Sequence, residues 1–241
     1  MPYGFPTHHP FGVTNVFPTD TLGDYPAPDP SRTFAIFDDF TTYTSGTPWA
    51  LTEVGTGTDA LTTGDFGQLL LTTTGAAGDN ECLQYLATTS MRTATAQGNK
   101  KLWFKTRLQV DDATLAAFTC GLYVTAASPI TTPPTDGIRL LKASGATSLS
   151  LVVTNGGVST TVANVGTVAN ATFVDLGIYY DVNFPRVACF VNGNRTGSAV
   201  ITNLPTSADL LRPSIAVQAG SAVARTMTID YIFAAQERDR P

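Results

Sequence analysis

Short apolar stretches with a two-residue period run through most of the chain from Arg32 onward. The clearest spans residues 101–110. Its even-numbered positions, Leu102 to Val110, are mostly apolar, and its odd-numbered positions, Trp103 to Gln109, are mostly polar. A period of two places alternate side chains on opposite faces of a β-strand. This segment is therefore predicted to be a strand with one covered face, and Trp103 is predicted to point away from the more apolar side.

Further strands are predicted where short apolar runs end at turn residues. Asn155-Gly156 and Asn192-Gly193 supply the positive φ angles that tight hairpin turns need. The one helical candidate, 111–117, is weak and is also compatible with a loop. Many short antiparallel strands predict an all-β fold, a two-sheet sandwich. The predicted strands are 34–37, 68–72, 82–86, 101–110, 120–124, 137–142, 149–154, 158–162, 173–180, 186–191, 214–218 and 227–234.

Residues 1–31 differ in composition from residues 32–241, which form the predicted sandwich domain. Seven of the fifteen prolines lie there, with no Lys or Arg. Proline at this density holds a chain extended. The segment is thus predicted to be an extended N-terminal arm that lies in a groove of its own domain, a sister subunit or another protein; the alternative is a disordered tail. Its aromatic residues are the predicted partner-binding residues: Tyr3, Phe5, Phe11, Phe17 and Tyr25.

Composition and charge narrow the function. The formal net charge is −5 and charged residues make up only 14% of the chain. A nucleic-acid partner is not expected, because binding phosphate needs a basic face. No membrane partner is expected either, because no long uninterrupted apolar run is present. The start of the chain lacks the pattern of a signal peptide. The three cysteines are expected to be buried thiols of a protein made in a cytoplasm.

Several short pieces of sequence follow one another in a recognisable order and spacing. They are Phe37-Asp38-Asp39-Phe40, Lys101-Leu102-Trp103-Phe104-Lys105-Thr106-Arg107, Gly121-Leu122-Tyr123-Val124, Asp136-Gly137-Ile138, Leu176-Gly177-Ile178-Tyr179-Tyr180-Asp181, Phe190-Val191-Asn192-Gly193 and Ile229-Asp230-Tyr231-Ile232, the last leading to Gln236-Glu237-Arg238. With these pieces, residues 33–238 resemble the concanavalin A-like (laminin-G-like) jelly-roll domains of tailed bacteriophages.

The resemblance implies a structural virion protein. It would be a head decoration or cement protein that binds the major capsid protein on the capsid exterior. Such proteins tend to occupy symmetry axes, which favours a homo-oligomer, a dimer or a trimer. The same fold also serves lectins, glycosidases and fibre modules, so the fold alone does not settle function. The alternative is therefore a carbohydrate-binding, lectin-like module of a phage fibre or head fibre.

Enzymatic chemistry finds little support in the sequence. Glycoside hydrolysis needs two carboxylates across one sugar bond. The only glutamates, Glu53, Glu81 and Glu237, are widely spaced, and none is predicted within a clear strand. The histidines form one pair, His8-His9, in the arm. We therefore expect that the protein is not an enzyme and has no catalytic residues.

Calcium ligands and exposed tryptophans are the remaining candidates for a binding site. The acidic groups Asp79-Asn80-Glu81, Asp136 and Asp38-Asp39 could hold calcium, but turn formation by Asp and Asn is the favoured interpretation. No metal or other cofactor is expected. Trp49 and Trp103 are possible surface contacts, for sugar or protein; the alternative is a large side chain that fills the face of the second sheet or packs under a loop.

Overall fold

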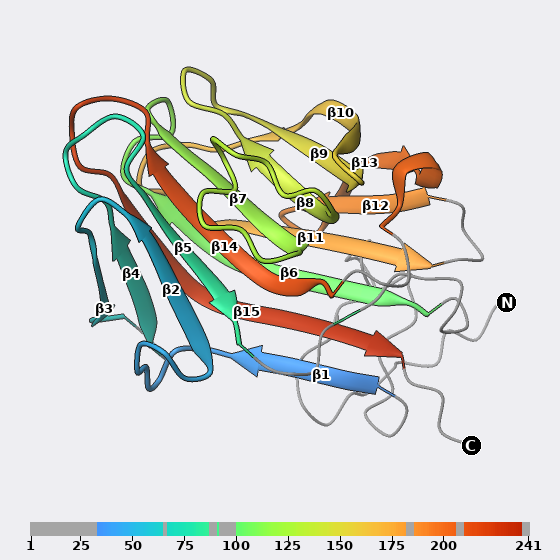
Figure 1. Ribbon diagram of the computed structural model, residues 1–241, viewed down its shortest axis with the longest axis horizontal. Coiled ribbons are helices and arrows are strands. Elements are labelled where there is room, and N and C mark those ends of the chain that lie inside the picture. Colours follow the sequence, from blue (N-terminus) through green and yellow to red (C-terminus); the bar gives the residue numbers. More distant parts are fainter. Residues whose placement is uncertain are drawn as a thin grey trace, which may run out of the picture.

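The computed structural model describes residues 33–64, 67–86, 91, 100–181, 186–205 and 210–237. These residues form two antiparallel β-sheets packed face to face, with one short 3-10 helix, Ile201–Asn203 (Figure 1). The predicted all-β, two-sheet antiparallel sandwich is confirmed. In the described part of the chain, no helix is long and apolar enough to cross a membrane. The arm predicted at residues 1–31 lies outside the described residues.

The first sheet has eight strands, and β1 pairs with β15 beside the main path of the sheet. From one edge to the other, followed by β1, its strands are β13 (Asn194–Val200), β12 (Arg186–Val191), β11 (Val174–Asp181), β6 (Leu102–Val110), β15 (Thr226–Glu237), β4 (Gln68–Thr72), β3 (Thr58–Thr62) and β1 (Thr33–Asp38).

The second sheet has seven strands and lies in front of the first in Figure 1. Its strands in order are β10 (Val158–Thr167), β9 (Ser148–Asn155), β8 (Gly137–Lys142), β7 (Ala116–Tyr123), β14 (Arg212–Ala219), β5 (Asn80–Tyr85) and β2 (Trp49–Val54).

Alternate residues of the strands build the core between the two sheets. On β6, Leu102, Phe104 and Leu108 are buried in this core, and Trp103 lies on the opposite face with Tyr179. The side chains of β6 thus point toward and away from the core as the sequence predicts. The hairpin turn at Asn192-Gly193 is also confirmed, because both residues have positive φ angles, 51° and 79°.

Three strands were missed, and two local predictions need correction. β2, β3 and β13 are edge strands with one neighbour each, so they lack the strong apolar pattern of a central strand. The helical candidate at 111–117 is wrong, because 112–115 is a turn and β7 begins at Ala116. The turn after β9 lies at Gly156-Gly157, one residue later than predicted: these two glycines have positive φ, and Asn155 pairs with Val158.

A loop of the chain covers the outer face of the seven-stranded sheet. Residues 124–136 connect β7 to β8 and lie in front of that sheet (Figure 1). The sheet binds the loop through buried polar side chains. Gln84 accepts the Ala126 N–H at 3.0 Å, Asn80 donates to the Ala127 carbonyl at 3.2 Å, and Arg139 donates to the Pro129 carbonyl at 3.0 Å. This face is therefore closed by polar contacts within the protein.

Candidate functional site

The edge strands β2 and β3 lie at one end of the sandwich and bring carboxylates together (Figure 1, left). Glu53 on β2 stands directly opposite Glu81 on β5. The electrostatic influence of Asp59 on β3 and of Asp79 before β5 also reaches Glu81. We call Tyr43, Glu53, Asp59, Asp79 and Glu81 the edge site.

The structure corrects the expectation from the sequence that the three glutamates lie outside clear strands. Glu53, Glu81 and Glu237 were expected outside clear strands, but they lie in β2, β5 and β15. Glu53 and Glu81 are 28 positions apart in the sequence, and only the antiparallel register of β2 and β5 places them opposite each other. Directly opposed side chains of an antiparallel pair have Cβ atoms about 5 Å apart. Two carboxyl groups therefore face one another at this edge.

Glu81 is the central group of the edge site. Its side chain is fully buried, and among the described residues only the Gly57 backbone comes near enough to interact weakly with its carboxyl oxygens. Burial, together with the negative charges of Glu53, Asp59 and Asp79, raises the pKa of Glu81 to about 8, and a backbone contact with Gly57 opposes the rise only weakly. Glu81 consequently holds a proton at neutral pH, as a buried carboxyl without a cation does.

Gly57 covers this carboxyl group and has to be a glycine. A Cβ atom at this position would lie 1.7 Å from Glu81 Oε1 and 2.4 Å from the Thr72 carbonyl oxygen. The backbone can therefore approach the acid only because the side chain is missing. Gly55 and Gly57, with acidic residues before and after them, are the sequence signal that could have indicated this approach.

Tyr43 adds an aromatic ring to the edge site. Its hydroxyl donates to Asp59 Oδ2 at 2.5 Å, and burial together with this hydrogen bond raises the pKa of Tyr43. The ring is half-buried and contacts Phe40 at 6.4 Å between ring centres. Sequence reasoning missed Tyr43 and Asp59, because their contact depends on the loop between β1 and β2.

Trp49 is buried in the core next to this region and does not form part of the protein surface. It is 0% exposed, its Nε1–H donates to Asp38 Oδ2 at 2.7 Å, and Tyr85 packs against its edge at 5.1 Å. The expectation of a surface contact at Trp49 is corrected, because its ring is buried in the core between the sheets. Trp103 is only 7% exposed and packs on Tyr179, on the outer face of the eight-stranded sheet.

The acidic groups that could have held calcium make turns and caps. Asp79 accepts hydrogen bonds from the Thr74 hydroxyl and the Ala76 N–H. Asp136 accepts the Gly156 N–H at 2.7 Å, and Asp38 accepts the Phe40 N–H at 2.9 Å. The turn-forming interpretation is confirmed for Asp38, Asp79 and Asp136, whereas Asn80 and Glu81 lie within β5. Within the described ranges, no group of three or more His, Cys, Asp or Glu residues is arranged to hold a metal ion.

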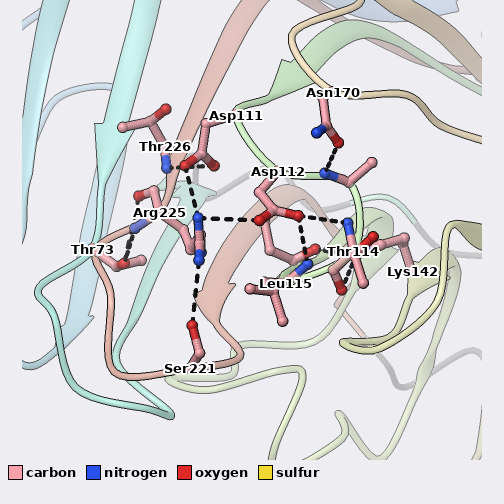
Figure 2. A network of polar contacts seen from close by, with 12 residues as sticks. Thr73, Asp111, Asp112, Thr114, Leu115, Lys142, Asn170, Ser221, Arg225 and Thr226 are labelled. Carbon is pink, nitrogen blue, oxygen red and sulfur yellow. Dashed lines mark hydrogen bonds and ion pairs between the residues drawn. The ribbon is translucent and has the colours of Figure 1, made fainter.

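A second charged region joins the loops that follow β6 and β14. Figure 2 shows the Arg225 guanidinium between Asp111 and Asp112, with N–O distances of 3.3 and 3.4 Å, and Ser221 at 3.3 Å. The N–H groups of Thr114 and Leu115 both donate to Asp112 at 2.9 Å. These backbone hydrogen bonds, with a smaller effect of Arg225, lower the pKa of Asp112.

Lys142 completes what we call the loop-end network: Asp111, Asp112, Lys142 and Arg225. Its buried ammonium group donates to the carbonyls of Thr114, at 3.1 Å, and Ala116. Burial lowers the pKa of Lys142 to about 8. These groups bind one another and the local backbone, so the network fixes the loops and is less suited than the edge site to bind a ligand.

The five aromatic residues predicted to bind a partner, Tyr3, Phe5, Phe11, Phe17 and Tyr25, lie outside the described residues. The structure therefore brings none of them to the edge site, and their role stays a prediction.

Comparison with known proteins defines the fold class. No protein-family model matches the chain, and no curated protein matches it. Among solved structures, the winged bean acidic lectin, complexed with methyl-α-D-galactose, has a TM-score of 0.60 and 14% sequence identity. This match covers 87% of this chain and all 100% of the lectin. The protein thus has a concanavalin A-like lectin fold.

Two further similar structures are enzymes. The endo-β-1,4-glucuronan lyase of Trichoderma reesei has a TM-score of 0.57 and 11% identity, with 85% of this chain and 95% of the lyase covered. A glycosidic hydrolase has a TM-score of 0.58 and 12% identity, with 83% and 94% covered. The expectation that the protein is not an enzyme is corrected by this finding, because glycan-active enzymes share its fold. Identities this low show the fold alone.

Proposed function

We propose that the protein is a lectin-like carbohydrate-binding module and that the edge site binds the sugar. The observation that carries this proposal is the hydrogen bond of the half-buried Tyr43 to the Asp59 carboxylate, beside Glu53 and the buried Glu81, at one edge of a lectin-type sandwich. Aromatic rings pack on the apolar face of a sugar, and carboxylates accept hydrogen bonds from its hydroxyl groups.

The charge of the edge site selects the class of glycan. The charged groups that act on Glu81 are all negative: Glu53, Asp59 and Asp79. A polymer rich in carboxylate or sulfate groups would be repelled there, since like charges brought close together cost free energy. The edge site therefore favours neutral sugars, whose hydroxyl groups supply only hydrogen-bond donors and acceptors.

The proposal is tested with the full chain on an array of neutral and acidic glycans, followed by calorimetry on the best neutral glycan. Asp59→Asn is expected to weaken that binding at least about tenfold, the effect of losing one charge-assisted hydrogen bond. Asp175→Asn is the matched control, because Asp175 also accepts a tyrosine hydroxyl, that of Tyr231, at 2.9 Å, but on β11 of the eight-stranded sheet, several strands away from β3.

Two outcomes would contradict the proposal. One is that no neutral glycan binds. The other is that the Asp59 and Asp175 variants bind the glycan equally well. Circular dichroism of both variants checks that each remains folded.

The capsid role remains a separate prediction. It rests on the phage resemblance and on residues 1–31, which lie outside the described residues. Attachment to the capsid exterior, and the dimer or trimer expected there, would be tested by co-sedimentation of the protein with undecorated capsids.

A further inference from the structure

The outer face of the eight-stranded sheet has an apolar patch that is separate from the core. Its residues come from four neighbouring strands, β6, β11, β12 and β15, and none belongs to the facing sheet. We call them the outer patch: Trp103, Tyr179, Ala188, Phe190, Phe233 and Ala235.

The register of the strands places the residues of the outer patch in rows across the sheet. Ala235, Trp103, Tyr179 and Ala188 stand opposite one another on successive strands. In this row small side chains flank the two large rings. In the next row Gly177 lies between Lys105 and Phe190. The first row therefore presents two adjacent rings, Trp103 and Tyr179, with a small residue at either end.

The outer patch is covered, although it faces away from the core. Trp103 is 7% exposed, Phe233 5% and Phe190 1%. The members of the patch all belong to one sheet, and such low exposure of large rings on the outer face of a sheet calls for a covering segment. On the neighbouring strand β1, Phe37 faces the same way and is 54% exposed. The cover therefore extends over β15, β6, β11 and β12 and does not extend to this part of β1.

We propose that residues 1–31 of the same chain lie across the outer patch. The first residue of β1, Thr33, pairs with Glu237, and the adjacent Gln236 pairs with Leu102, the neighbour of Trp103. The chain before Thr33 thus starts beside the patch. Crossing from β1 to β12 takes about four strand spacings, roughly 19 Å, which about six extended residues span.

The composition of residues 1–31 matches this surface. The segment contains five aromatic residues, three aspartates and no Lys or Arg. The outer patch is aromatic, and three of the four lysines of the chain lie in β6 or directly before it: Lys100, Lys101, which pairs with Asp181 and Glu237, and Lys105. Apolar rings and opposite charges therefore meet, which favours this segment over a basic one. Rings buried in this way are not free to anchor the protein to a capsid.

The first experiment measures the exposure of Trp103 in the full chain by acrylamide quenching of tryptophan fluorescence. Trp49 is fully buried in the core and serves as an internal reference. Replacing Phe5, Phe11 and Phe17 by Ala is expected to increase the quenching severalfold and to shift the emission to longer wavelength. Unchanged quenching in a variant with wild-type circular dichroism would overturn the proposal.

The second experiment changes the side of the proposed contact that belongs to the sheet. Trp103→Ala in the full chain is expected to make residues 1–31 severalfold more sensitive to chymotrypsin, which cuts after aromatic residues. Tyr231→Ala, on the same face but outside the outer patch, is the matched control and should leave the cleavage rate unchanged. Equal cleavage of both variants and wild type would contradict the proposal.

A dilution series distinguishes the chain's own segment from that of a second copy. If quenching of Trp103 in the wild-type protein stays constant from high to low micromolar concentration, the cover belongs to the same chain. If quenching rises as an oligomer dissociates, a second copy provides the cover and the proposal is overturned.

Discussion

The edge site and the loop-end network are both rich in carboxyl groups, yet the pKa of a carboxyl group is shifted in opposite directions in the two regions. The pKa of Glu81 is raised to about 8, whereas that of Asp112 is lowered. Asp112 accepts two backbone N–H groups and faces Arg225. Glu81 has at most a weak backbone contact with Gly57, and the charged groups that shift its pKa are all acidic.

The difference shows how partners decide the state of an acid in this protein. In the loop-end network, each carboxylate meets a cation or a backbone donor, so its charge stabilises the loops (Figure 2). At the edge site, the protein buries a carboxyl group and leaves it without a partner. Such arrangements lower stability and are concentrated at sites that bind ligands or perform chemistry. Changes to one region at a time should therefore have effects of opposite sign.

The largest effect is expected from removing the cation of the loop-end network. Arg225→Ala should lower the free energy of unfolding by about 3–4 kcal/mol, because Asp111 and Asp112 lose their common partner. Urea denaturation at pH 7 measures the change. Arg107→Ala is the control, since Arg107 forms its ion pair with Asp230 at a side-chain exposure of 40%; it should cost about 1 kcal/mol or less. Equal losses of unfolding free energy in the two variants would show that the loop-end network contributes no more stability than an exposed ion pair.

A change of opposite sign is expected at the edge site. In the folded protein Glu81 keeps its proton up to about pH 8, whereas in the unfolded chain it releases the proton near its ordinary pKa of 4.5. The wild-type protein should therefore lose stability as pH rises from about 4.5 to about 8.

Glu81→Gln removes this dependence, because the amide has no proton to release in that range. The variant should be about 2–3 kcal/mol more stable than wild type at pH 9 and nearly equal to it at pH 4. Thermal denaturation across this pH range tests the sign. A variant that is less stable than wild type at pH 9 would mean that the Glu81 carboxylate is paired in the folded protein.

The smallest effect is expected from Asp112→Asn. The amide oxygen can still accept the N–H groups of Thr114 and Leu115, so only the charge facing Arg225 is lost. The midpoint of thermal unfolding should fall by about 2 °C or less at pH 7.

The difference between variant and wild type should shrink as pH falls below the ordinary pKa of 3.8 and disappear below the lowered pKa that Asp112 has in the folded protein. A difference that does not shrink as pH falls below 3.8 would assign the effect to the turn instead of the charge.

Much of the fold follows from local pattern in the sequence. The strand at 68–72, the strand at 186–191 and the turn at Asn192-Gly193 lie where the sequence predicts them. These features depend on alternation and on glycine, which act between near neighbours in the chain. The edge strands β2, β3 and β13 were missed because a half-exposed strand can form without a strong alternation of apolar and polar residues.

Sequence alone also determined which residues were available for chemistry: three glutamates, few bases and two tryptophans. Only the tertiary structure decided what they do. The register of β2 and β5 placed Glu53 opposite Glu81, and the core enclosed Trp49. Proton affinity and exposure depend on distances between residues far apart in the chain, and those distances are set when the two sheets pack together.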